Sequence, residues 1–353
     1  MVLAALSVGD TNSARKGHEA LSAATRLAPD LPDVRIARGF QYLMEQRDPQ
    51  RAMQEFEWVM KLVPSSPAAS VGVGTARMMQ GRTAEALDSF EEAMALDPRN
   101  AEAANGAYGS AFHMRDSVKA RRYVDRLIAI QPDNPLPYGY KAVLAASLGG
   151  NPREAAAVMR EAVARVGAPA AAFVIIDAPL TVLAHVDTVT QRALIAVALN
   201  AFPGDTADYY FFKAALHRTR RERALERHYA DSVIRFLEAR NQPANNSTWV
   251  GRTYTLAMSY AQLGRATEAV ALAKQAVERP PVNQQALERK VALQILAEVY
   301  ALLGQDNAAI DQLEYLLSIP SNVSIPWLRI GAPWDSLRDS PRFQRLLEQD
   351  SKR

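Results

Sequence analysis

Small and apolar residues recur in this chain at an interval of 34 residues, and each interval holds two stretches with the apolar spacing of an amphipathic helix. Proline keeps this interval at Pro64, Pro98 and Pro132, where it would end the second helix of each pair because it has no backbone N–H. A small residue keeps the same interval inside that helix, as Ala52, Ala86 and Ala120. Two helices approach closely where such small side chains meet. The pattern therefore predicts an all-α chain of antiparallel helical hairpins.

Residues 67–100 show one complete unit of this pattern. Gly74 and Gly81 lie in and after its first helix, Ala86 and Phe90 lie in its second helix, and Pro98 ends it. The unit resembles the tetratricopeptide repeat (TPR), a 34-residue helical hairpin. The resemblance implies a right-handed superhelical solenoid, and the spacing along the chain gives about nine helical hairpins followed by a C-terminal capping segment.

The regularity of the repeats divides the chain into four predicted regions. Residues 1–168 hold regular hairpins, the first of them truncated, residues 169–245 hold irregular TPR-like hairpins, and residues 246–320 return to the register. Residues 321–353 read as a cap, because Pro326 and Pro333 prevent a long helix and two tryptophans can cover apolar surface. The opening MVLAAL is apolar where a terminal repeat ordinarily presents a polar face, so we expect that residues precede Met1.

The C-terminal part resembles a narrower group of proteins. The stretches that carry this resemblance are YAQLGRATEAVALAKQAVE (260–278), YALLGQDNAAIDQLEYLLSIPSNVSIPWLRI (300–330) and APWDSLRDSPRFQRLLE (332–348). They are similar to the TPR regions at the C-terminus of bacterial serine/threonine protein kinases and of related adenylate-cyclase and winged-helix regulators. The resemblance implies a sensory or docking module with a catalytic or DNA-binding domain attached on its N-terminal side.

The charge of the chain argues against two classes of partner. Its 41 basic and 38 acidic residues give a net charge of +3, too weak a field to favour nucleic acid or an anionic membrane. The apolar stretch 166–186 contains two prolines and Asp177, so we read it as the buried first helix of a repeat, with no membrane insertion. No targeting signal is visible, and the compartment stays open between the cytoplasmic and periplasmic sides of a bacterial membrane.

No residue pattern in the chain predicts catalysis, a metal or a cofactor. Cysteine is absent, and the histidines His18, His113, His185, His217 and His228 show no metal-ligand spacing. No nucleophile, base and orienting group can be placed together, and the kinase motifs are missing. The sequence therefore favours a non-catalytic chain without a cofactor.

The first helices carry the strongest binding signal. In TPR arrays the concave groove is lined by fixed positions of each first helix, and these positions are apolar and rich in methionine here. We predict a peptide-binding groove from Ile36, Phe40, Met44, Val71, Thr75, Met78, Asn105, Phe112 and His113. The alternative is that some of these side chains pack between adjacent hairpins.

A second signal is a basic run at Arg218, Arg220, Arg221, Arg223 and Arg227. Glu222 and Glu226 interleave with it and can pair with the arginines at helical spacing, so a solvated helix face is the default and a phosphate-binding patch is the alternative. Taken together, the sequence favours a protein-interaction scaffold that binds a protein or peptide, from the C-terminal region of a bacterial signalling protein. Two alternatives are a ligand-sensing regulatory segment of a kinase or cyclase, and an autonomous assembly or secretion adaptor.

Overall fold

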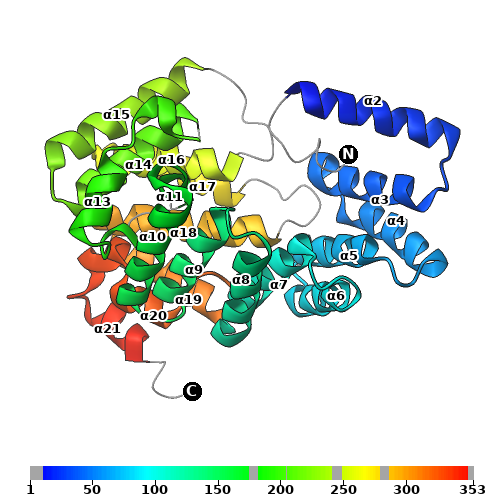
Figure 1. The fold of residues 1–353 in the computed structure, drawn as a ribbon. Coiled ribbons are helices and arrows are strands. Elements are labelled where there is room, and N and C mark those ends of the chain that lie inside the picture. The colour runs from blue at the N-terminus through cyan, green and yellow to red at the C-terminus, as the bar shows by residue number, and fades with distance from the viewer. Residues whose placement is uncertain (1–10, 175–181, 204, 241–248, 279–285, 349–353) are drawn as a thin grey trace. The chain divides into compact units, whose positions relative to one another are not determined.

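The computed structural model describes residues 11–174, 182–203, 205–240, 249–278 and 286–348, and within them the chain is helical and has no strand (Figure 1). The apolar opening of the sequence lies outside the described residues. The chain forms two compact units, Met1–Ala111 with Pro280–Leu287, and Phe112–Arg279 with Glu288–Arg353. No described helix is long and apolar enough to cross a membrane.

The first unit consists of helical hairpins that begin and end where the sequence predicts. Its helices are α2 (Thr11–Leu27), α3 (Pro32–Gln41), the π-helix η1 (Tyr42–Gln46), α4 (Pro49–Leu62), α5 (Pro67–Met79), α6 (Thr83–Leu96) and most of α7 (Ala101–His113). Asp48 and Ser66 cap α4 and α5 by accepting hydrogen bonds from backbone N–H groups, and proline follows each cap at the first helical position. Pro64 and Pro98 lie just beyond the ends of α4 and α6, as predicted.

Phenylalanine rings inserted between glycines hold successive hairpins of this unit together. A Cβ atom on Gly39 or Gly72 would lie only 2.5 or 2.4 Å from the ring of Phe56. The same arrangement recurs one repeat later, where Phe90 lies between Gly74 and Gly106. The predicted small residues Ala52, Ala86 and Ala120 are fully buried. The close approach of paired helices at small residues, which the sequence predicted, is therefore confirmed.

A π-helical turn accounts for an irregularity in the repeat spacing. Gly39 stands one residue early relative to Gly74, while the flanking positions keep the 34-residue interval. The extra residue is taken up by η1, where the backbone N–H of Asp48 reaches back to the carbonyl oxygen of Tyr42. The first helix of this hairpin consequently ends at the same place in the repeat as α5.

The second unit begins with regular hairpins and then becomes irregular. It contains α8 (Ser117–Ile130), α9 (Leu136–Ser147), α10 (Pro152–Val166), α11 (Ala168–Phe173), α13 (Thr188–Ile195), the 3-10 turn η2 (Leu199–Ala201), α14 (Thr206–Thr219) and α15 (Arg223–Ala239). The first residues of the apolar stretch after Gly167 form α11, and residues 175–181 of the first helix predicted there lie outside the described residues. Asp187 caps the short α13, on which Gln191 replaces the usual alanine.

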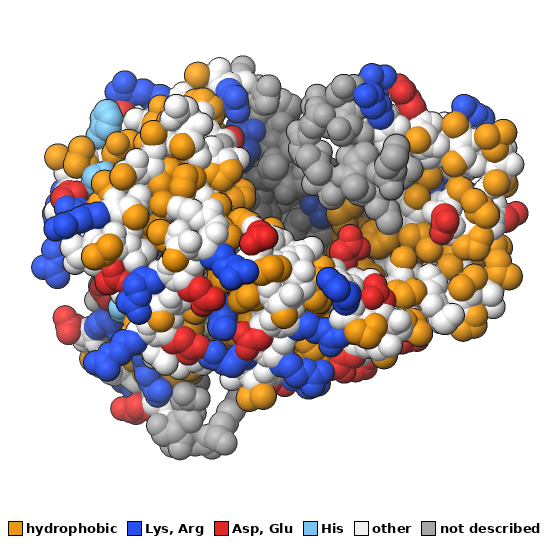
Figure 2. Space-filling view, in the orientation of Figure 1, with side chains coloured by type: hydrophobic (Ala, Val, Ile, Leu, Met, Phe, Trp, Pro, Cys, Tyr) orange, Lys and Arg blue, Asp and Glu red, His pale blue; other side chains and the backbone are white. Residues whose placement is uncertain are grey.

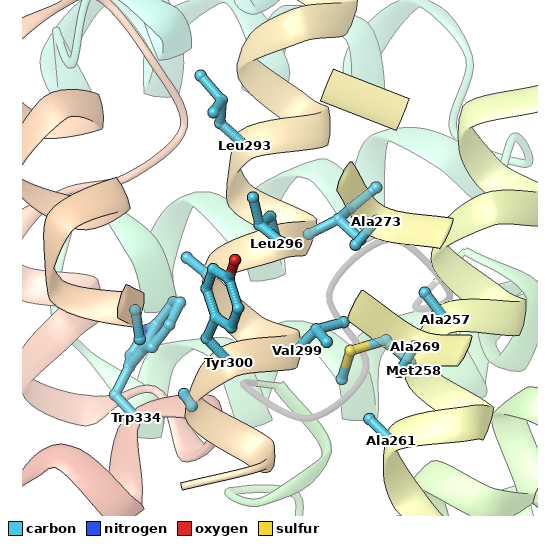
Figure 3. Packing of buried hydrophobic residues seen from close by; sticks show 14 of the residues in the cluster. Ala257, Met258, Ala261, Ala269, Ala273, Leu293, Leu296, Val299, Tyr300 and Trp334 are labelled. Carbon is cyan, nitrogen blue, oxygen red and sulfur yellow. The ribbon is translucent and has the colours of Figure 1, made fainter. Parts of the chain in front are cut away.

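The last hairpins of the second unit enclose a continuous core. They comprise α16 (Trp249–Gln262), α17 (Ala266–Glu278), α18 (Ala286–Leu302) and α19 (Asp306–Ser318), and they are followed by α20 (Ile325–Ile330), η3 (Ala332–Leu337) and α21 (Pro341–Leu347). Figure 3 shows Trp334 beside Tyr300 on one side of α18, with the alanines of α16 and α17 on the other side. Trp334, Leu337 and Phe343 are fully buried, so the tail acts as the predicted cap.

The C-terminal cap also contacts the early part of the same unit. Helix α20 packs against α9, and the hydroxyl of Ser324 donates a hydrogen bond to the carbonyl oxygen of Ser147. Arg342 of α21 forms ion pairs with Asp311, at 2.7 Å, and with Glu314, at 2.6 Å, on α19. The cap therefore ties the last hairpin to α9 within one unit.

Candidate functional site

The predicted groove residues separate into buried and accessible side chains. Ile36, Val71 and Phe112 are buried and pack between helices, which is the alternative that the helical spacing left open. Phe112 and His113 belong to the second unit, and the other predicted positions belong to the first. A stripe of apolar positions on a helix serves inter-hairpin packing and surface binding alike, so spacing alone does not separate the two.

The accessible positions lie on α3 with η1, on α5 and on α7. Met44 is 42% exposed, Asn105 is exposed, and Phe40, Thr75 and Met78 are half-buried. The ring of Phe40 is held edge-on against Phe56, with ring centres 5.2 Å apart. This contact fixes the phenyl ring at the surface before any partner arrives.

Charged side chains of both signs occupy much of the visible face of the molecule, and its right-hand part shows more hydrophobic side chains (Figure 2). Lys and Arg side chains are interspersed with Asp and Glu side chains in Figure 2. Many arginines are paired; for example, Arg121 of α8 forms an ion pair with Glu154. The mixed surface agrees with the near-balanced composition, so a local group of four arginines, three of them without an ion pair among the described residues, stands out against it.

Such a group lines a pocket of about 720 Å³ in the second unit. Its arginines are Arg218, Arg221, Arg223 and Arg227, at the end of α14, in the turn after it and on α15. The opposite wall comes from the next two hairpins, through Ala261, Gln262, Gly264, Leu302 and Leu303. The pocket is thus formed where the turns of consecutive hairpins meet. A neighbouring pocket of about 340 Å³ shares Arg218, Arg221 and Leu302 and extends toward Asp335 of the cap.

Arg221 occupies a turn position that glycine fills in most of the other hairpins. Its φ is 59°, whereas Gly81, Gly264 and Gly304 adopt φ of 70–78° at the corresponding turns. The left-handed conformation costs a residue with a Cβ atom roughly 1 kcal/mol compared with glycine. Arginine in place of the turn glycine is a signal that could have been found in the sequence.

The acidic residues near this turn are already bound to other partners. Glu222 accepts a hydrogen bond from Arg220 and lies 2.6 Å from Nδ1 of His217, and these contacts lower the pKa of its carboxyl. Glu226 lies 3.7 Å from Arg218, and burial raises the pKa of the Glu226 carboxyl. Glu222 and Glu226 thus pair with arginines, but the partners lie two and eight positions away along the chain and not at the helical spacing that was predicted. Within the described residues, however, no carboxylate forms an ion pair with Arg221, Arg223 or Arg227.

A buried carboxyl lies behind Arg218. Glu298 of α18 is 3% exposed and accepts hydrogen bonds from the hydroxyl of Tyr254, at 3.3 Å, and from Nε2 of Gln294, at 3.0 Å. Burial raises the pKa of Glu298 to about 7. Burial also lowers the pKa of Arg218, which stays a cation because arginine titrates far above neutrality.

One polar group of the pocket wall has no hydrogen-bond partner. The Oε1 atom of Gln262 is buried and unbonded in the described structure. A buried amide that makes no hydrogen bond is unfavourable by roughly 1–3 kcal/mol, so such groups often face a ligand or an ordered water. Sequence reasoning missed Gln262 because it lies on a helix separate from the arginine run.

Comparison with known proteins identifies the repeat type. Tetratricopeptide-repeat family models match residues 38–101, 77–144 and 254–283. Residues 38–144 and 254–283 carry tetratricopeptide repeats. No curated protein matches the sequence. The TPR fold predicted from the 34-residue interval is therefore confirmed, and the matches include the hairpins in which Phe56 and Phe90 insert between glycines.

Several solved structures resemble this chain at low sequence identity. Yeast Tom70 is 15% identical, with a TM-score of 0.51, over 84% of this chain and 60% of that one. A chain of the APC/C hetero-tetramer Cut9–Hcn1 is 14% identical, with a TM-score of 0.49, over 93% of this chain and 51% of that one. A TPR protein from Parabacteroides merdae is 13% identical, with a TM-score of 0.41, over 85% of this chain and 98% of that one. At these identities the likeness concerns the fold alone.

Proposed function

We propose that this TPR chain is a non-catalytic scaffold that binds an apolar peptide segment of a partner protein. The proposed contact surface, here called the methionine face, consists of Phe40, Met44, Thr75 and Met78 on the first helices of two consecutive hairpins. The observation that carries the proposal is that this face is partly exposed, apolar and uncharged, with Met44 42% exposed.

The chemistry of the methionine face suits an apolar helix or an extended peptide. Thioether side chains are flexible and repack around ligands of different shape. The Phe40 ring, held against Phe56, provides a rigid anchor beside them. Helix-in-groove recognition uses apolar residues at i, i+3, i+4 and i+7 of the bound segment, and few ion pairs accompany it.

The wider context of this function is also part of the proposal. The similarity of residues 260–348 to the C-terminal TPR regions of bacterial kinases and cyclases supports a module of a signalling protein with a further domain on its N-terminal side. The arginine-lined pocket favours one alternative, a segment that senses a small ligand. An autonomous assembly or secretion adaptor is the other alternative.

The proposal is tested with fluorescent peptides in a polarisation assay. An amphipathic peptide of about four helical turns is compared with a scrambled peptide of the same composition at two salt concentrations. We expect saturable binding of the amphipathic peptide that changes little with salt, and a loss of at least tenfold in affinity for Met44→Glu with Met78→Glu.

The matched control places the same charges elsewhere on the first unit. Leu27 and Leu62 are 86% and 60% exposed and lie outside the methionine face, so Leu27→Glu with Leu62→Glu should leave affinity unchanged. Equal loss of peptide affinity in both pairs of variants, or peptide binding that disappears in moderate salt, would contradict the proposal. Salt-sensitive binding would instead indicate that the peptide contacts exposed arginines.

A further inference from the structure

We propose that the arginine-lined pocket of the second unit binds a small molecule that carries phosphate groups together with an apolar or ring-shaped part. The pocket lies at the turn after α14 and is separate from the methionine face, which belongs to the first unit. The two proposals are therefore independent, because either surface can bind its ligand when the other does not.

The charge of the pocket identifies the anionic part of the ligand. Four arginines line it, and the single carboxylate of its lining, Glu226, already faces Arg218 at 3.7 Å. Arg221, Arg223 and Arg227 form no ion pair among the described residues, and all three are exposed and line the pocket. Planar guanidinium groups bind two phosphate oxygens at once, so three of them together match a diphosphate better than a single carboxylate.

The opposite wall identifies the rest of the ligand. Ala261, Leu302 and Leu303 supply an apolar surface, and Gln262 supplies a buried amide oxygen that makes no hydrogen bond. An amide beside an apolar wall is suited to the polar edge of a flat ring. The volume of about 720 Å³ lies within the range of small-molecule sites and is much larger than a lone phosphate requires. A nucleoside diphosphate has this combination of features.

The turn itself gives a second reason to assign a ligand to the arginines. Arg221 adopts φ of 59° at a turn where several other hairpins have glycine and two have arginine, Arg47 and Arg115. It forms no ion pair among the described residues. A strained backbone conformation that no contact within the folded protein offsets is typical of ligand sites. The default reading, a solvated helix face, explains Arg220 and its partner Glu222 and leaves Arg221 unexplained.

The test measures binding to the full chain by calorimetry at constant ionic strength. The probes are inorganic pyrophosphate, ADP and adenosine. We expect pyrophosphate and ADP to bind at one site, ADP more tightly than pyrophosphate, and adenosine at least tenfold more weakly than ADP. Arg223→Gln with Arg227→Gln should weaken ADP binding at least tenfold, and the near-isosteric Gln262→Met should weaken ADP more than pyrophosphate.

The control removes two exposed arginines that lie outside the pocket. Arg192 is exposed on α13, and Arg235 on the same helix α15 pairs only with Asp231 among the described residues. Arg192→Gln with Arg235→Gln changes the net charge equally, so ADP affinity should stay within twofold of the unaltered chain. An equal loss of ADP affinity in both double variants would overturn the assignment, because the change in net charge alone would then explain the weaker binding.

A glycine variant separates a ligand role from a structural one. Arg221→Gly removes a guanidinium and relieves the left-handed backbone at the same time, so the free protein should melt at a higher temperature while ADP binds more weakly. A lower melting temperature would indicate that Arg221 serves the fold. Absence of saturable binding by pyrophosphate and ADP at millimolar concentration would overturn the proposal, as would tighter binding of a phosphoserine peptide than of ADP.

Discussion

The Nε atom of Arg115 donates a 2.7 Å hydrogen bond to the carbonyl oxygen of Val323, although 208 positions separate the two residues. The rest of the guanidinium binds carbonyl oxygens at the end of α19, with Leu316 at 2.7 Å, Leu317 at 3.0 Å and Ile319 at 2.9 Å. The last carbonyl groups of a helix have no partner within the helix, and a cation there also opposes the negative end of the helix dipole. Arg115 thus joins the α7–α8 turn to the C-terminal cap within the second unit.

Among the described residues, Arg115 is one of three arginines with positive φ at a turn of this kind, the others being Arg47 and Arg221, and its φ is 60°. Unlike Arg221, it has a full set of intramolecular acceptors that offset the strain of this conformation. Contacts within the fold therefore explain the conformation of Arg115. No such contacts among the described residues explain the conformation of Arg221.

Replacing Arg115 by alanine should destabilise the chain strongly. The charged donor is lost, and several carbonyl oxygens in a half-buried site are left without hydrogen bonds, so the free energy of unfolding should fall by roughly 2–4 kcal/mol. Denaturant unfolding measures this change. Arg153→Ala is the control, because Arg153 is exposed and should contribute less than about 0.5 kcal/mol. Equal stability of the two variants would show that the contacts of Arg115 do not stabilise the fold.

A methyl group on Gly72 should also be destabilising. The added Cβ atom would lie 2.4 Å from the ring of Phe56, so the hairpins must separate or the ring must move, and overpacking of this kind costs roughly 1–3 kcal/mol. Gly72→Ala combined with Phe56→Leu should recover part of the loss, because leucine lacks the outer ring atoms. Thermal melts of the two variants measure the difference.

Gly251 provides a control of opposite sign for that substitution. It lies in α16, and a Cβ atom built on it would meet nothing within 4 Å. Because alanine favours helix over glycine, Gly251→Ala should be neutral or stabilise by up to about 1 kcal/mol. Destabilisation by both alanine variants would show that close contact with Phe56 is not the cause.

Local pattern was sufficient to predict the regular hairpins. Proline and alanine act within one or two helices, and the second helices α4, α6 and α8 end just before Pro64, Pro98 and Pro132, as the sequence indicated. The phenylalanines that insert between glycines were predictable for the same reason, because Phe56 and Phe90 recur at the 34-residue interval. The irregular stretch around α11 was predicted only as a loss of register, because its short helices lack the repeating residues.

The candidate sites were predicted less well because they depend on distant residues. Helical spacing places Ile36, Val71 and Met78 on similar stripes, and only the packed structure shows that the first two are buried. The basic run was visible in the sequence, but its apolar wall comes from Leu302 on another hairpin. The contact between Arg115 and Val323 has no periodic signal at all.

Stability should depend on pH through Glu298, which is fully buried with its pKa raised from 4.5 to about 7. Between these values the folded chain keeps a proton that the unfolded chain releases, so the free energy of unfolding should fall as pH rises through this window. This rise in the pKa of Glu298 corresponds to a total on the order of 3 kcal/mol. Arg218 attracts the ionised form, but burial is the larger effect.

Glu298→Gln should remove this part of the pH dependence, because glutamine resembles the protonated acid and cannot ionise. The variant and the unaltered chain should have similar stability near pH 4.5, and the variant should be more stable at pH 8 by on the order of 3 kcal/mol.

Urea unfolding at pH 5, 6, 7 and 8 measures the difference. Subtraction of the two stability curves cancels the contribution of Glu226, whose pKa is also raised by burial. Glu161→Gln, at an exposed position of α10, should leave the pH profile unchanged. Parallel profiles for the unaltered chain and Glu298→Gln would mean that the buried carboxyl is ionised throughout this range and that Arg218 neutralises it.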